Sequence, residues 1–307
     1  MELIQDVSYL SLHPKNKTTI TYIKKYHLGC TGWSLQEWVG TFFKEKTKPG
    51  DFLSQYSSVF NSVEGNTTFY SAPSKELIQQ WAEKTPDGFK FCFKFPKTIT
   101  HIKSLKDVDS EVQAFLELFD DVRDKLGPFM IQFPDSFSPG ELKRLEALLS
   151  SLPKTLSYGV EVRHLDFFDH GKNEHNLNTM LQSYGVERII FDTRKLHSSN
   201  SSIFSVVEAK KKKPKVPVRF EALSSRPIVR FVGVNDILNN EAYLKEWAIV
   251  VADWINDGLH PYVFIHAPDV ISQPKLCTHF HKLLAELIEL QPLSEWPVNR
   301  EAQLGLF

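Results

Sequence analysis

The sequence has few cysteines and no excess of either charge. Only three of its 307 residues are cysteines, Cys30, Cys92 and Cys277, and no two of them have Cys-x-x-Cys spacing. This pattern predicts reduced, buried thiols in a cytosolic protein. Lysine and arginine number 36 against 37 aspartates and glutamates, so the chain lacks the basic excess typical of nucleic-acid-binding proteins. Any basic surface must therefore be local.

Long apolar runs are also absent. No apolar stretch approaches the roughly 20 residues that span a bilayer, and the first residues do not combine a basic start with a long apolar core. We therefore expect a soluble, cytoplasmic chain without membrane contact. Hydrophobic residues make up 42% of the sequence, which is enough for one large core.

Short apolar runs alternate with amphipathic segments along the whole chain. Eight of these runs are predicted strands: residues 25–33, 62–69, 89–95, 128–133, 156–163, 188–192, 227–233 and 261–266. Helical spacing follows most of them. Eight such units over about 250 residues favour a (β/α)8 TIM barrel of α/β class, with a doubly wound open sheet as the alternative.

The same pattern predicts one domain with a leader, a long loop and a tail in addition to the barrel. Residues 1–25 form a polar leader, and residues 26–292 form the barrel. Residues 194–226 have no clear amphipathic spacing and contain a lysine run, so we expect a long basic loop on the top face. Residues 293–307 form an extended, mobile tail.

The alternation within the strands places polar side chains inside the barrel. Residues two apart share a face of a strand, and the apolar face packs against the helices. In the second strand Glu64 and Asn66 therefore point inward. The same rule selects further inward residues near the strand ends: Lys94, Gln132, Glu161, Arg163, Asp192, Arg230 and His266.

The carboxyl ends of barrel strands are where barrel enzymes build their active sites. A buried network of paired charges that merely fills the barrel is the competing interpretation. Burying ions costs several kcal/mol each and seldom repays itself in stability. This cost favours catalysis or ligand binding, and both interpretations stay open.

Five motifs in order resemble the YecE-like family, domain of unknown function 72: "GCTGWSLQEWVGTFF", "FNSVEGNTTFYSAPS", "FKFCFKFPKTITH", "LGPFMIQFPDSF" and "YGVEVRH". The resemblance runs from about Leu28 to the last helix. It implies a (β/α)8 barrel and leaves the activity open. Two positions depart from the family pattern, since Val232 stands where a histidine is usual and "FIHAPD" replaces paired asparagines. His266 and Asp269 offer replacement polar groups there.

The inward bases predict an anionic ligand. Lys94, Arg163 and Arg230 suit phosphate or carboxylate groups. We assign catalytic roles to Glu64, Glu161 and Asp192, and to His101 as general base. The remaining inward side chains are assigned to ligand binding: Asn66, Gln132 and His266, together with the three bases. The favoured function is a phosphodiester hydrolase or DNA-repair-type factor.

Two other chemistries stay open. Glu64 and Glu161 have the residue types that act as acid and base on a glycoside or a sugar phosphate. A divalent zinc, manganese or magnesium ion is the second alternative, with Glu64, Glu161, Asp192 and His266 as ligands. No His-x-x-x-His or His-x-His spacing supports this metal site.

The final pentapeptide suggests a macromolecular partner. Gln303, Leu304, Leu306 and Phe307 resemble the peptide by which bacterial DNA polymerases and repair proteins bind the sliding clamp. Such a peptide inserts its apolar side chains into a groove. Lysines 210–213 and Lys215 would then follow a nucleic-acid backbone, or form an ordinary solvated loop. A non-catalytic clamp-associated module, and a tail that packs back on the barrel, are the alternatives.

Overall fold

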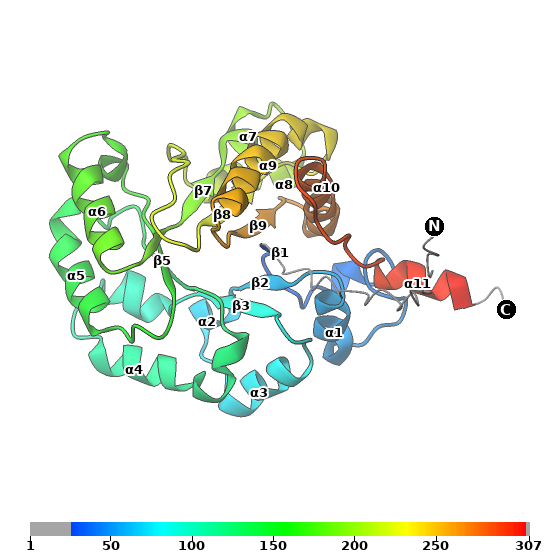
Figure 1. The fold of residues 1–307 in the computed structure, drawn as a ribbon, viewed down its shortest axis with the longest axis horizontal. Helices are drawn as coiled ribbons and strands as arrows, with labels where there is room; N and C mark the ends of the chain where they lie inside the picture. The colour runs from blue at the N-terminus through cyan, green and yellow to red at the C-terminus, as the bar shows by residue number, and fades with distance from the viewer. Residues whose placement is uncertain (1–25, 305–307) are drawn as a thin grey trace, which may run out of the picture.

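A computed structural model describes residues 26–304, and Figure 1 shows its strands in the middle of the molecule with helices around them. The predicted leader, residues 1–25, lies outside the described residues. The strands in this range are β1 (His27–Gly29), β2 (Ser62–Gly65), β3 (Lys90–Phe93), β4 (Phe129–Gln132), β5 (Tyr158–Glu161), β6 (Glu187–Arg188), β7 (Ile190–Asp192), β8 (Ile228–Val232) and β9 (Tyr262–His266).

The α-helices are α1 (Phe52–Ser57), α2 (Thr67–Tyr70), α3 (Lys75–Glu83), α4 (Asp109–Glu117), α5 (Leu142–Ser151), α6 (Lys172–Ser183), α7 (Arg194–Ser198), α8 (Phe204–Lys212), α9 (Glu241–Asn256), α10 (Gln273–Ala285) and α11 (Pro297–Leu304). The spacing of the apolar residues in α9 explains why this helix packs against the core. Leu244, Trp247 and Val251 follow one another at three- and four-residue intervals, and all three are buried.

All strand pairs are parallel, and they form three sheets. The orders are β1-β9-β8-β7, β2-β3 and β4-β5-β6. Backbone hydrogen bonds also join neighbouring sheets: the Glu64 amide donates to the Cys30 carbonyl at 3.0 Å, and the Phe95 amide donates to the Met130 carbonyl at 2.9 Å. The chain therefore has the predicted α/β fold with parallel strands, paired as three sheets rather than as one closed sheet.

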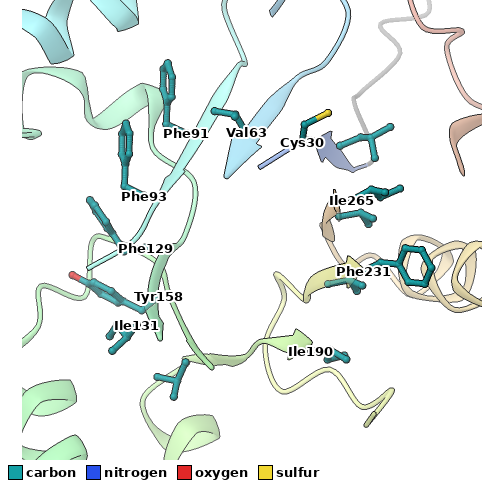
Figure 2. Close-up of a cluster of buried hydrophobic side chains, with 14 of the residues drawn as sticks. Cys30, Val63, Phe91, Phe93, Phe129, Ile131, Tyr158, Ile190, Phe231 and Ile265 are labelled. Atoms are coloured by element: carbon teal, nitrogen blue, oxygen red, sulfur yellow. The ribbon is translucent and has the colours of Figure 1, made fainter. Parts of the chain in front are cut away.

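Side chains from all three sheets meet in one small apolar cluster. Its members are Cys92, Met130, Ile189, Ile228, Tyr262 and Phe264. The opposite faces of the strands belong to the larger core under the helices, and Figure 2 shows Phe91, Phe93 and Phe129 on that outer side. The strands thus have an inner and an outer face, as their alternation predicted.

The strands are shorter than the predicted runs, and two of them differ in a further way. The second strand ends at Gly65, and the residues that continue its alternation form the short helix α2. The predicted sixth strand is divided into β6 and β7, which pair with β5 and β8 respectively. Alternation of apolar and polar residues over so few positions does not distinguish a strand from one helical turn.

Two larger predictions are wrong. The segment after β7 contains helices α7 and α8, and the lysine run ends α8 instead of lying in a long loop. The tail contains helix α11 instead of being extended throughout. All three helices are short, and a few turns are too short for helical spacing to stand out in the sequence.

The three cysteines are free and buried, as predicted. Cys30 and Cys277 are in contact, with their sulfur atoms 3.5 Å apart. Between residues 26 and 304, no helix is both long and apolar enough to span a membrane.

Gly29 provides a test of how closely β1 and β2 approach. A Cβ atom on Gly29 would lie 2.0 Å from the carbonyl oxygen of Ser62, a backbone atom of β2 that cannot move aside cheaply. We expect Gly29→Ala to lower the free energy of unfolding by about 3 kcal/mol or more. Urea denaturation measures the change.

Gly50→Ala is the matched control, because a Cβ atom there meets nothing within 4 Å. Its effect should stay within about 0.5 kcal/mol. Equal stabilities for the two variants would show that β1 and β2 do not approach as described.

Candidate functional site

The inner faces of the strands change from apolar to polar toward their carboxyl ends. Lys94, Gln132, Arg230 and His266 each lie two residues after a member of the inner apolar cluster. Glu64 is the next-to-last residue of β2, and Glu161 is the last residue of β5. We call these six residues the polar cluster.

Arg230 lies at the centre of the polar cluster and is only 2% exposed. Its guanidinium binds Glu64 through two hydrogen bonds, from Nε to Oε2 at 2.7 Å and from Nη2 to Oε1 at 2.8 Å. Its Nη1 donates to Glu161 Oε2, and to Gln132 Oε1 at 3.4 Å. One side chain of β8 therefore binds side chains from β2, β4 and β5.

Glu64 accepts two further contacts. Lys94 Nζ lies 2.9 Å from Oε1, and His266 Nε2 lies 3.1 Å from Oε2. Burial alone would raise the pKa of Glu64, but Arg230 and Lys94 outweigh it and hold this pKa well below its ordinary value. Glu64 is therefore a carboxylate whose two oxygens are both engaged by cations.

Glu161 is the second ionised carboxylate. Arg163 contacts its Oε1 through Nε at 2.8 Å and Nη2 at 2.7 Å. Burial raises the pKa of Glu161, yet Arg230 and Arg163 together lower it to about 2. Arg163 itself is partly exposed, so it forms the boundary between the polar cluster and the solvent.

Burial lowers the pKa values of the basic side chains in the polar cluster, whereas it raises those of the acidic ones. Burial, followed by repulsion from Arg230, lowers the pKa of Lys94 to about 8. Burial also lowers the pKa of His266 to about 3, in spite of its contact with Glu64. At neutral pH His266 is therefore a neutral imidazole, whereas most Lys94 side chains carry a charge.

The prediction that Asp192 points inward is wrong. Its Oδ2 accepts hydrogen bonds from Arg194 Nη2 and from Trp247 Nε1, both at 2.8 Å. Its neighbour Phe191 faces inward, with its ring 4.9 Å from the guanidinium carbon of Arg230. The buried charge of Asp192 is satisfied by an arginine and by helix α9, so an aromatic ring occupies the inner position.

His101 lies beside the polar cluster in a single helical turn after β3, Thr98–Ile102. Its Nδ1 is 2.8 Å from the hydroxyl of Thr100, which leaves Nε2 for another partner. Burial, together with the charges of Arg163 and Lys97, lowers its pKa to about 4. His101 is therefore neutral at pH 7 and close to the exposed cations.

Lys213 is a member of the site that the sequence did not single out. It follows helix α8, is partly buried, and its pKa is lowered by burial and then by Arg230. Lys210 and Lys211 of the same run bind Ser199 and Glu208, whereas the ammonium of Lys213 has no partner among the described residues. The lysine run predicted a basic segment, but not which lysine reaches the cluster.

The other predicted residues lie apart from these contacts. The Asn66 amide donates to the Thr31 carbonyl at 3.0 Å, so it joins two loops. The backbone of Gln303 and Leu304 belongs to α11, while Leu306 and Phe307 lie outside the described residues. Clamp binding stays a prediction.

The donors present do not fit a divalent metal. In the described part of the chain, no three His, Cys, Asp or Glu side chains come together as ligands. Glu64 and Glu161 bind cationic side chains, and Asp192 points to the helices.

The free energy of unfolding of a variant without Arg230 measures how strongly the fold depends on the polar cluster. In Arg230→Met, Glu64 and Glu161 lose their shared partner, and we expect the free energy of unfolding to fall by about 3–5 kcal/mol at pH 7. Arg144→Met is the control, because Arg144 of α5 is partly exposed and pairs with Glu141, the residue just before that helix. That change should cost less than about 1 kcal/mol, and similar losses in both variants would contradict the central role of Arg230.

His266 should make the protein less stable in acid. Its pKa is lower in the folded than in the unfolded chain, so the unfolded chain binds the extra proton, and stability falls as pH drops below about 6.5. Between pH 7 and pH 5, protonation of this histidine in the unfolded chain lowers the free energy of unfolding by about 2 kcal/mol. We expect His266→Gln to remove that part of the pH dependence in urea denaturation, and exposed His175→Gln to leave it intact; matching profiles for both variants would refute this role.

Comparison with known proteins identifies the family. The family model described as "Protein of unknown function DUF72" matches residues 27–300. The UPF0759 protein YecE of Escherichia coli K12 is 37% identical over 266 residues, which cover 87% of this chain and 94% of that protein.

Solved structures have the same fold. A DUF72 family protein from Thermotoga maritima, TM1631, gives a TM-score of 0.67 at 25% identity, covering 84% of this chain and 98% of that one. A DUF72 family protein from Enterococcus faecalis, EF0366, gives a TM-score of 0.66 at 16% identity, covering 88% and 98%. The chain therefore belongs to the DUF72 family, whose members include YecE.

Proposed function

We propose that the three sheets are sectors of one (β/α)8 barrel, and that the carboxyl ends of its strands bind an anionic ligand carrying phosphate or carboxylate. The inner apolar cluster supports the barrel, because it draws side chains from every sheet. The polar cluster would then lie at the end of the barrel where active sites are usually built.

The charge balance is the observation that carries the proposal. Glu64 and Glu161 contribute two negative charges, and Lys94, Arg163 and Arg230 contribute three positive ones. Lys213 adds a fourth positive charge, whereas Asp192 is compensated by Arg194. An excess of about two positive charges in a partly buried place favours a ligand with one or two negative charges.

The ligand would contact the outer members of this group. Glu64 and Arg230 are almost fully buried and bound to each other, so they form the base of the site. Arg163 and Lys213 are more exposed, and Lys213 has no protein partner in the described range. A guanidinium and an ammonium group are well suited to bind the oxygens of one phosphate.

We infer phosphodiester hydrolysis as the reaction, with His101 as the general base. A water molecule would attack phosphorus, pass a proton to His101 Nε2, and displace the alcohol, which leaves with that proton as the ester bond breaks. An anion bound at Arg163 would offset the charge that, after burial, most lowers the pKa of His101. The imidazole would thereby become a stronger base when the ligand is present.

Glycoside hydrolysis has less support. It needs one carboxylic acid that stays protonated near neutral pH. The pKa values of both Glu64 and Glu161 are lowered by the neighbouring cations, so neither side chain supplies that proton. A sugar phosphate, by contrast, falls within the proposed class of anionic ligands.

Binding of phosphate monoesters and diesters, measured by calorimetry, tests the proposal. Arg163→Gln and Lys213→Gln should each weaken binding about tenfold or more, since each removes a charge-assisted hydrogen bond worth about 1.5–3 kcal/mol. Affinity should also fall as the pH rises through about 8, because Lys94 then loses its charge.

Lys75→Gln, an exposed lysine on α3, is the matched control and should bind like the wild type. Unchanged affinity in both site variants would refute the anion site. Bound diester that is never hydrolysed, or hydrolysis that survives His101→Gln, would refute the assigned reaction while leaving the binding site in place.

A further inference from the structure

A second cationic cavity lies at the amino-terminal ends of the strands, opposite to the polar cluster. It has a volume of about 230 Å³. Its polar lining comes from the starts of several strands and the segments before them: Lys90, Arg123, Thr155, Ser157, Arg226 and Tyr262. No residue of the polar cluster lines this cavity, so the two places are separate.

The cations of this cavity are only partly compensated. Arg123 pairs with Asp120 at 2.7 Å and donates to the Thr155 hydroxyl at 3.3 Å. Lys90 Nζ donates to the backbone carbonyl of Asp124 at 2.5 Å. Lys90 forms no ion pair with a carboxylate in the described range.

Arg226 is similarly uncompensated. It donates to the hydroxyl of Ser157, and in the part of the chain that the structure describes it forms no ion pair. Burial lowers the pKa of Lys90, the charge of Asp124 opposes this, and Arg226 lowers it again. The two cations thus repel each other across a cavity that has no acidic lining residue.

We propose that this cavity binds a small oxyanion, either phosphate or the phosphate group of a small ester. An anion between Lys90 and Arg226 would relieve their repulsion. Arg123 offers a further guanidinium, and the hydroxyls of Thr155 and Ser157 can donate hydrogen bonds to phosphate oxygens.

The size of the cavity limits the ligand. Its volume equals that of roughly eight water molecules at about 30 Å³ each. It is smaller than the about 300–1,000 Å³ of sites for drug-sized ligands. Phosphate with a short organic group, such as a pentose phosphate, is the largest class that this volume favours.

Calorimetric titration of the full chain with inorganic phosphate and with ribose 5-phosphate tests this site. Arg226→Gln and Lys90→Met should each weaken one class of binding sites at least tenfold, whereas Arg226→Lys should retain most of the affinity. Lys75→Gln is the control for loss of one exposed positive charge. Thermal unfolding identifies any variant that fails to fold, and the remaining variants then decide.

The two anion sites are distinguished by their variants. Arg163→Gln acts on the polar cluster and should leave the Arg226-dependent binding unchanged, even if the function proposed for the polar cluster is wrong. The second site is refuted if folded Arg226→Gln and Lys90→Met both bind phosphate and ribose 5-phosphate like the wild type. It is also refuted if Arg163→Gln alone abolishes all binding of both probes.

Discussion

The pairing of Arg230 with Glu64 and Glu161 is the interaction on which the rest of the structure depends. These three side chains come from three different sheets, on β8, β2 and β5. Each buried charge costs several kcal/mol unless it is paired and hydrogen-bonded. The three sheets must therefore converge on one point, and the inner apolar cluster fills the space below it. The pairing of these three charges therefore fixes the positions of the carboxyl ends of β2, β5 and β8 relative to one another.

This pairing also separates a buried base, formed within the polar cluster, from more exposed side chains beside the cluster. Glu64 and Arg230 satisfy each other and are nearly inaccessible, so they act as a rigid base. Arg163, Lys213 and His101 are more exposed and keep unused donor or acceptor atoms. Under the function proposed above, the buried charge network would support the ligand site as an outer layer. The same cations that keep the glutamates ionised produce the positive excess that favours an anion.

The alternation within the strands correctly predicted which side chains point inward where those side chains have no hydrogen-bonding partner on the outer face. Lys94, Gln132 and His266 lie where the two-residue period places them, because each follows a buried apolar residue on the inner face. Asp192 failed the same rule. Its polarity suggested an inward position, but Trp247 and Arg194 provide hydrogen bonds on the outer face, and neither is recognisable as its partner from the sequence.

The sequence by itself determined the family, the parallel α/β class, and the strand ends that become polar, because motifs and periodicity are local properties. Only the tertiary structure decided which charges meet. Arg230 and Glu64 are 166 residues apart in the chain, and Lys213 reaches the site through a helix whose pattern was too short to predict. The partner of a buried charge depends on contacts between distant segments. Those contacts exist only once the sheets have assembled around them.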